Sequence, residues 1–365
     1  MFPVIDLQGT PHQRGRSHGE RARARVERSL ANYVKLFAFV GLDWAEAQRR
    51  GAAYRDVVGA FDPGLLEEME GIARGAGRPF AEILALNART EILPPSFLTG
   101  SDPGECTAIA VRPAASGTGE TLLAQNWDWV GSQRESMVLL RVAEGEGAPA
   151  CLTLTEAGML AKIGLNAQGF GVCLNILRST FDDGRPGVPV HVLLRSLLKR
   201  ASVRDAVAFA STLEFGGSSN VLCADRGGDA AAMEVSPRGL RVVQIEGGTL
   251  CHTNHFLHPE AAAWQATHVP NLSTLPRLAR ARELADARAM HGIEDLKTLL
   301  RDESDGLLSI CREPDRALPA EAQIETVASV VMELGRGVMH VAPDVPSRAD
   351  YAPVTLASKG EVAIA

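Results

Sequence analysis

The sequence predicts a protein of the α+β class, in which helices and mainly antiparallel strands occupy separate parts of the chain. Residues 1 to about 100 carry helical patterns with helix-start and helix-stop signals. After Cys106 the pattern changes to short apolar runs bounded by Gly, Asn or Glu, which is typical of strands. The later order of strands, then helices, then strands favours a layered domain over a doubly wound one.

The first helix is expected to begin at Thr10-Pro11-His12-Gln13, which combines a capping Thr, a Pro at the first helical position and a Gln three residues after the cap. It should run to about Phe39. Gly15 and Gly19 lie four residues apart on one face, which indicates close packing of another backbone. Further helices are expected over residues 44–60, 62–75 and 80–93, and Pro94-Pro95 ends the last of them.

Arg89 and Glu91, near the end of this last helix, allow two interpretations. They could form an exposed ion pair. They could also line a site, because only a short linker separates them from Cys106. That linker, residues 94–104, is rich in Pro, Ser, Gly and Asp, and it is the natural place for a chain boundary.

The second half of the chain should begin with a hairpin, because two β-prone runs, 107–111 and 121–124, flank a polar turn. Antiparallel strands of one sheet are then expected over 137–142, 151–155, 160–165 and 169–174. Helices over 188–200 and 203–213 precede strands over 221–224, 230–235, 240–245 and 249–252. Helices over 275–290 and 293–301 and a hairpin of 326–334 with 337–341 close the chain.

Composition narrows the classes of function. The 365 residues are 45% hydrophobic with a net charge of −7, so a real core is expected, without a basic face for nucleic acid or a polybasic membrane anchor. No signal peptide or bilayer-spanning run is visible. Four of the six cysteines lie within β-like apolar runs, which indicates buried, reduced thiols and a cytoplasmic location; they are Cys151, Cys173, Cys223 and Cys251. The oligomeric state is left open, including a homo-oligomer.

Cys106 differs from these cysteines because it follows the polar linker directly and starts a strand. A structural thiol is the common fate of a lone cysteine, whereas a nucleophile needs a base beside it. No His lies between Cys106 and the end of the hairpin. One candidate base is the α-amino group that Cys106 would gain if the Glu105–Cys106 bond were cut, with an unperturbed pKa of about 8.

Three motifs carry a resemblance to a known family: Glu105-Cys106-Thr107, Gln125-Asn126-Trp127-Asp128-Trp129 and His252-Thr253-Asn254-His255. In this order and spacing the chain resembles the acyl-coenzyme A:6-aminopenicillanic acid acyltransferase (isopenicillin N acyltransferase) family of self-cleaving N-terminal-nucleophile (Ntn) hydrolases. The resemblance implies a four-layer αββα sandwich of mainly antiparallel sheets with an N-terminal helical segment. It divides a zymogen into a helical chain, residues 1–105, and a core, residues 106–365, which together form one structural unit.

The resemblance also implies roles for three residues. The Cys106 thiol would attack the carbonyl of Glu105 to release the new N-terminus, and would then form an acyl-enzyme with the substrate. Asp128 would hold the new ammonium group and tune its pKa, although a surface acid in a turn is the alternative. Asn254 would donate to the oxyanion, although an Asn that caps a strand end is the alternative.

Three further residues are candidates for contact with the substrate. Asn126 would orient the same amine as Asp128, and Trp127 would form pocket wall or core. Asn175 ends the alternating run Val172-Cys173-Leu174. Related bile-salt amidases place an Asn near this position against the substrate, and a structural turn Asn is the equally weighted alternative.

A metal-binding reading starts from His252, His255 and His258, which recur at three-residue spacing. Pro259 and the surrounding β pattern argue against the single helical face that such ligands use, so no metal and no cofactor are expected.

The predicted function is therefore a cysteine Ntn amidohydrolase that cleaves the amide bond of a small N-acyl or peptide-like substrate. The alternatives are an acyltransferase that passes the acyl group to or from an amine or a CoA thioester, and a non-catalytic or metal-binding relative of the fold. The expected partners are the small-molecule amide and the two chains of the same precursor.

Overall fold

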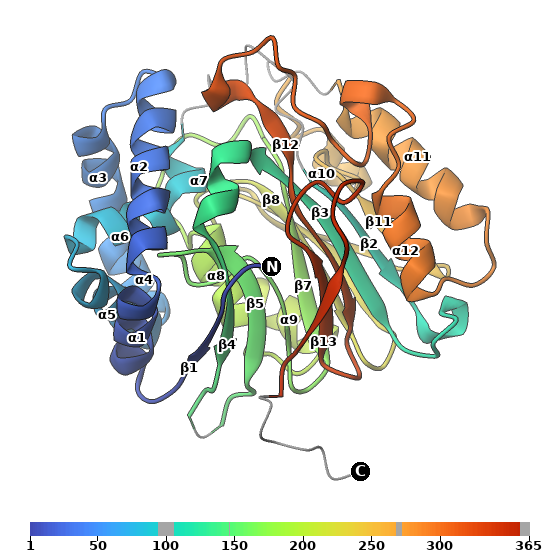
Figure 1. Ribbon diagram of the computed structural model, residues 1–365, viewed down its shortest axis with the longest axis horizontal. Helices are drawn as coiled ribbons and strands as arrows, with labels where there is room; N and C mark the ends of the chain where they lie inside the picture. The colour runs from blue at the N-terminus through green and yellow to red at the C-terminus, as the bar shows by residue number, and fades with distance from the viewer. Residues whose placement is uncertain (94–105, 146, 268–271, 358–365) are drawn as a thin grey trace.

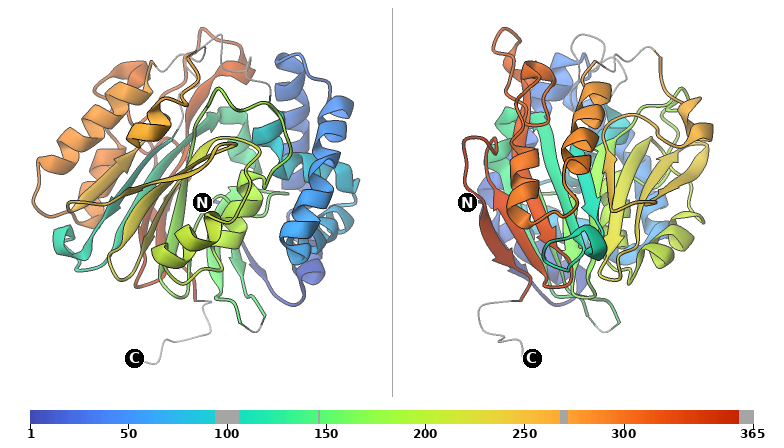
Figure 2. Two further views of the ribbon diagram at one scale, coloured as in Figure 1. Left: turned by 180° about the vertical axis from the view of Figure 1, so that it is seen from behind. Right: turned by 90° about the vertical axis from the view of Figure 1, so that its right-hand side faces the viewer.

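The computed structural model describes residues 1–93, 106–145, 147–267 and 272–357. Two β-sheets face each other, and helices cover their outer faces (Figure 1). The helices α11 (Thr274–Asp286) and α12 (Ile293–Leu300) cover one sheet, and α8 (Val190–Leu197) and α9 (Val203–Ala210) cover the other (Figure 2). This arrangement is the predicted αββα sandwich. None of the helices in the described ranges is long and apolar enough to cross a membrane.

The larger sheet has eight strands, and its only parallel pair in the described part of the chain is β1 with β4. In spatial order the strands are β1 (Val4–Leu7), β4 (Met137–Val142), β5 (Cys151–Glu156), β6 (Ile163–Asn166), β7 (Phe170–Ile176), β8 (Ser219–Asp225), β9 (Ala230–Ser236) and β10 (Gly239–Gln244). The sequence patterns predicted seven of these strands within a few residues. They did not predict β1, because four residues with one partner strand carry too short a pattern.

The smaller sheet has six antiparallel strands. In spatial order they are β11 (Thr249–His252), β2 (Thr107–Val111), β3 (Leu122–Val130), β12 (Ile324–Glu333), β13 (Val338–Ala342) and β14 (Ala352–Thr355). The predicted hairpin is β2–β3, in which Thr107 lies opposite Asn126. The predicted closing hairpin is β12–β13. The sequence patterns did not predict strand β14.

Side-chain alternation along β2 separates two cores. Cys106, Ala108 and Ala110 belong to the large core between the sheets, whereas Ile109 and Val111 pack beneath α11 and α12. A side chain on either strand of the central hairpin therefore faces either the opposite sheet or the outer helices. This choice decides which residues can meet at the site.

Residues 1–93 form β1 and seven α-helices, which pack beside the sandwich and share its large core. They are α1 (Pro11–Arg21), α2 (Arg23–Phe39), α3 (Trp44–Ala52), α4 (Tyr54–Phe61), α5 (Pro63–Ala76), α6 (Phe80–Asn87) and α7 (Arg89–Ile92). Three predicted helices are each divided in two, at Ala22, Ala53 and Ala88. Alanine gives no signal of a break, since it is the strongest helix former. The division of the chain at residues 105 and 106 stays a prediction.

Gly15 and Gly19 lie where α1 crosses α5, as their spacing predicted. A Cβ atom on Gly15 would overlap the carbonyl oxygen of Glu68, and one on Gly19 would overlap that of Ile72. Gly71 and Gly75 of α5 meet the backbone of α1 in the same way. The two helices therefore approach through their backbones, which only glycine permits.

Candidate active site

Cys106 is the first described residue after the linker and lies at the start of β2, buried to 3% exposure. Its side chain belongs to the core between the sheets. Burial and, next, the Cys106 thiol raise the pKa of Cys173 on β7, which places the two sulfur groups near each other. Glu105, the other residue of the predicted cleavage bond, lies outside the described residues.

The carbonyl group of Cys106 is held by two buried side chains. Asn175 Nδ2, on β7, donates to this oxygen at 2.8 Å, and Arg277 Nη1, on α11, donates to it at 3.0 Å. Asn175 is itself positioned by Asn220, whose Nδ2 donates to Asn175 Oδ1 at 3.0 Å. The backbone of the predicted nucleophile is thus fixed from both the opposite sheet and the outer helix layer.

Arg277 also connects Cys106 to Asn254. Its Nη2 donates to Asn254 Oδ1 at 3.0 Å, and its Nη1 donates to Thr107 Oγ1 at 3.1 Å. Asn254 Nδ2 donates to the carbonyl of Ile176 at 2.9 Å.

Asp128 is buried at the end of β3, where a β-bulge interrupts the pairing with β12. Its Oδ1 accepts a hydrogen bond from Thr326 Oγ1 at 2.7 Å, and its Oδ2 is buried with no hydrogen-bond partner among the described residues. Burial raises the pKa of Asp128 to about 6, against the opposing effect of Arg277 and, more weakly, of Thr326, Arg312 and Lys162. Arg277 therefore acts electrostatically on the third predicted catalytic residue as well.

Asn126 and Trp127 both make contacts within the core of the protein. Asn126 Nδ2 donates to the carbonyls of Leu300 and Ile310 at 2.8 and 2.9 Å, so its amide nitrogen ties β3 to the end of α12 and the segment that follows. Trp127 is fully buried in the large core, with the ammonium of Lys162 3.8 Å from its ring centroid. Asn126 Oδ1 is buried with no hydrogen-bond partner among the described residues. The predicted role of Asn126 toward the new amine, and contact of either residue with substrate, stay predictions.

The three histidines around Asn254 serve the loop that carries it. His252 Nε2 lies 2.9 Å from Glu234 Oε1, and the same carboxylate accepts from the backbone N–H groups of Leu257 and His258. His255 Nδ1 lies 2.9 Å from Thr274 Oγ1. Among the described residues no group of three His, Cys, Asp or Glu side chains is placed to hold a metal ion.

The interpretation of Arg89 and Glu91 as an exposed ion pair is wrong. Arg89 is 1% exposed and pairs with Glu156 at 3.2 Å. Glu91 instead accepts a hydrogen bond from the backbone N–H of Val190 at 2.8 Å and lines a cavity beside the site. The second interpretation, in which this helix end lines the site, stays a prediction for Glu91.

Arg277 is the main residue of the site that sequence reasoning missed. The signal was present in the helical pattern, because Arg277 shares a buried stripe with Ala281 and Ala285 on α11. A cation on the apolar face of a helix needs a polar partner, and such a position is a candidate for a site. Lys162 and Arg312, both buried, also act on the pKa of Asp128 and were not predicted.

The paired sheets and their outer helices define the fold class. The fold is that of an Ntn hydrolase. It is similar to a variant of conjugated bile acid hydrolase from Clostridium perfringens, with a TM-score of 0.51 and 14% identity, over 68% of this chain and 92% of that one. This likeness shows the fold alone.

Residues 115–346 match the model of the acyl-coenzyme A:6-aminopenicillanic acid acyl-transferase family, and the chain belongs to this family. The matched range contains Asp128 and Asn254 and begins shortly after Cys106. The chain is 29% identical over 325 residues to the acyl-coenzyme A:6-aminopenicillanic-acid-acyltransferase 40 kDa form of Emericella nidulans, covering 84% of each. It is also 23% identical over 232 residues to the protein dcd1A of Dictyostelium discoideum, covering 54% of this chain and 50% of that protein.

Proposed function

We propose that the chain is a precursor that cuts itself between Glu105 and Cys106 and then acts as a cysteine amidohydrolase on a small N-acyl or peptide-like amide. The observation that supports the proposal is that both Asn175 and Arg277 donate hydrogen bonds to the Cys106 carbonyl. A residue that becomes a chain terminus loses the restraint of the preceding peptide. Two hydrogen bonds to its carbonyl keep its thiol and amine in one orientation.

In maturation, the Cys106 thiol attacks the carbonyl carbon of Glu105, and the peptide bond is replaced by a thioester. Water hydrolyses the thioester and leaves a carboxylate on Glu105 and a free amine on Cys106. In turnover, that amine takes the thiol proton while the sulfur attacks the substrate carbonyl. Loss of the amine product leaves an acyl-enzyme, which water resolves.

Asp128 and Asn254 have separate tasks in this scheme. The ionised carboxylate of Asp128 stabilises the ammonium form of the new terminus by opposite charge. Asn254 donates an N–H of its amide to the developing oxyanion, and Arg277 holds the amide in place through Oδ1. Arg277 is thus a positioning residue for both Cys106 and Asn254.

The test of maturation is the intact mass of the purified protein under denaturing conditions, together with N-terminal sequencing. The expected result is two chains, 1–105 and 106–365, with Cys106 at the second N-terminus, whereas Cys106→Ala should give one chain. Active protein that retains only Met1 as its N-terminus would overturn the self-cleaving mechanism.

Acyl transfer is the second candidate, and the family match and the acyltransferase from Emericella nidulans favour it. Both reactions share the acyl-enzyme and differ in the group that resolves it. Adding an amine acceptor or coenzyme A to a reaction with an accepted amide distinguishes them. A new amide or thioester that forms at the expense of the free acid identifies a transferase, and free acid alone identifies a hydrolase.

A further inference from the structure

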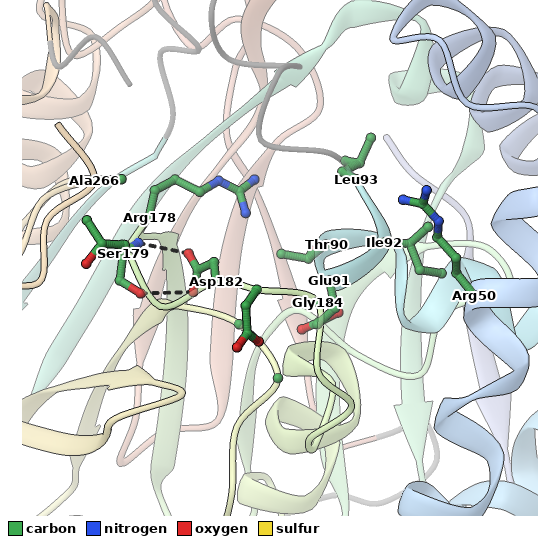
Figure 3. A pocket seen from close by; sticks show the side chains of 14 residues that line it. Arg50, Thr90, Glu91, Ile92, Leu93, Arg178, Ser179, Asp182, Gly184 and Ala266 are labelled. Atoms are coloured by element: carbon green, nitrogen blue, oxygen red, sulfur yellow. Dashed lines mark hydrogen bonds between the residues drawn. The ribbon is translucent and has the colours of Figure 1, made fainter. Parts of the chain in front are cut away.

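A cavity of about 360 Å³ lies beside the candidate active site, between the end of α7 and the segment that follows β7 (Figure 3). Asn175, which binds the Cys106 carbonyl, is three residues from Arg178 in the cavity wall. Three residues of extended chain span about 10 Å. A ligand bound at Cys106 would need a group about this far from Asn175 to reach the cavity, whose volume suits a small ligand.

Most charged groups in the cavity wall already have partners. Asp182 accepts hydrogen bonds from the Ser179 backbone at 2.8 Å and from the Ser179 and Ser218 hydroxyls. Asp183 pairs with Arg185. Arg50 pairs with Glu46 at 2.9 Å. These groups maintain the wall and need no ligand.

Arg178 and Glu91 are the exceptions. The guanidinium of Arg178 extends into the cavity, and it makes no hydrogen bond or ion pair with any residue in the described ranges (Figure 3). Its Nε is buried. Glu91 uses Oε1 to accept from Val190, and its Oε2 is buried without a hydrogen-bond partner in the same ranges. Burial raises the pKa of the Glu91 carboxyl to about 7 and Arg178 opposes this effect, so the two groups act on each other across the cavity without forming an ion pair. The guanidinium keeps its fork of donors for a ligand, and that fork matches a carboxylate.

We propose that Arg178 binds a carboxylate of the substrate, so that the enzyme selects amides that carry a carboxylate a short distance from the scissile bond. The surrounding charge favours a ligand with a single negative charge, because Asp182 and Asp183 line the same cavity and would repel a dianion such as phosphate more strongly. This inference rests on the proposed amidohydrolase function and adds its substrate class.

The test uses two matched pairs of probes. In the first pair, glutaryl-4-nitroanilide and pentanoyl-4-nitroanilide, the carboxylate lies in the acyl part. In the second pair, hexanoyl-glycine and hexanoyl-glycinamide, it lies in the amine part. The mature enzyme should prefer the carboxylate probe in at least one pair. Arg178→Gln should reduce this preference in kcat/KM by about tenfold to a hundredfold, mainly through KM, as expected for the loss of a charged hydrogen-bonded pair.

Two control variants sharpen the result. Arg178→Lys keeps the charge and should retain part of the preference. Arg50→Gln removes a cation from the same cavity wall that is already paired, and it should leave the preference unchanged. Thermal melting of each variant separates loss of binding from loss of folding. Hydrolysis without a carboxylate preference, or a preference that survives Arg178→Gln, would overturn the inference.

A binding arm separates this inference from the proposed function. Glutarate, which has no amide bond to be cleaved, is titrated calorimetrically into the purified wild-type protein and into its Arg178→Gln variant. Binding that requires Arg178, in an enzyme that hydrolyses no probe, would support the carboxylate site and contradict the amidohydrolase. Absence of both binding and hydrolysis would overturn both.

Discussion

Asp128 carries a buried carboxyl group whose ionisation should control maturation. Burial raises its pKa to about 6, so the carboxyl is ionised above this pH and neutral below it. If the carboxylate is needed around Cys106, the rate of self-cleavage should fall as the pH drops through about 6. The measurement is the rate at which the two chains appear, in protein refolded at pH 5 to 8.

Asp128→Asn provides the comparison. It removes the titrating group with little change in shape, so cleavage should be slow at every pH. A wild-type rate that does not change between pH 5 and 8 would contradict the role of Asp128.

The rate of acyl transfer should depend strongly on Asn254, because this residue is the proposed oxyanion donor. Asn254→Ala removes that donor, and the rate of acyl transfer from any accepted amide should fall about a hundredfold or more. Thermal melting should show that the fold is retained, since the loop is also held by Glu234. Turnover within a few-fold of wild type would exclude the oxyanion role.

The sequence predicted which residues lie near Cys106 better than it predicted where their side chains point. Cys106, Asn175 and Asn254 share one hydrogen-bond network in the structure. Asn126 belongs to the same motif as Asp128, yet its amide nitrogen donates to carbonyls at the end of α12 and in the segment that follows. A motif shows which residues are neighbours in the chain. It does not show which backbone carbonyls lie opposite them, because Leu300 and Ile310 come from 174 and 184 residues away.

At the scale of the element, the stability of the α1–α5 crossing should be sensitive to a single added methyl group. Gly15→Ala would place a methyl group on the Glu68 carbonyl oxygen, so the helices must separate, at a cost of about 1–3 kcal/mol of unfolding free energy. Gly59→Ala on α4 is the matched control, because its Cβ would meet only the flexible Leu66 side chain at 3.3 Å.

Urea unfolding measures both glycine variants. The control should be neutral or up to about 1 kcal/mol more stable, since alanine is the better helix former. Equal effects at the two positions would mean that the crossing tolerates a side chain.

Regular elements were predictable where their patterns were long. The strand of residues 137–142 was predicted with the bounds of β4, and the hairpin of β2 and β3 was predicted from its β-prone runs and turn. The breaks at Ala22 and Ala53 were not, because they depend on what each helix packs against. α1 packs against α5. α2 instead contacts the segment directly before β4, where Arg25 donates a hydrogen bond to the Glu135 carbonyl.

At the scale of the whole molecule, buried histidines should make stability depend on pH. Burial lowers the pKa of His18 to about 4, and its Nε2 accepts from the Gly158 backbone. The folded state therefore holds neutral His18, while the unfolded chain binds a proton below about pH 6.5. Stability should fall as the pH drops from about 6.5 to 4, by up to about 3 kcal/mol from this group. Burial also lowers the pKa of His191 and His255.

His18→Gln tests the assignment, because glutamine keeps an acceptor and does not titrate. Its unfolding free energy, measured with urea at pH 7, 5.5 and 4.5, should vary less than that of the wild type. His12→Gln, at an exposed position of the same helix, should behave as the wild type. An unchanged slope in His18→Gln would assign the pH dependence to other groups.

The two proposed chains should remain associated after cleavage. A buried ion-pair network joins Arg14 and Glu68 of the N-terminal segment to Glu144 and Arg195 of the core. Removing one partner would leave buried charges unpaired, which is strongly unfavourable. The chains should therefore copurify and separate only under denaturing conditions. Elution of the core alone from a sizing column would contradict this expectation.

The parallel pairing of β1 with β4 can form only late in protein synthesis, because the two strands lie far apart in the chain. Val4 pairs with Leu139, so a ribosome adding about 5–20 residues per second needs roughly 7–27 s to supply this partner. The α1–α5 crossing joins residues only about 50 positions apart and can form much earlier. Cys106 leaves the ribosome before Asn175, Asn254 and Arg277 exist. The proposed self-cleavage should therefore wait until the chain has been made at least as far as Arg277, and a translation product that ends before this residue should stay uncut.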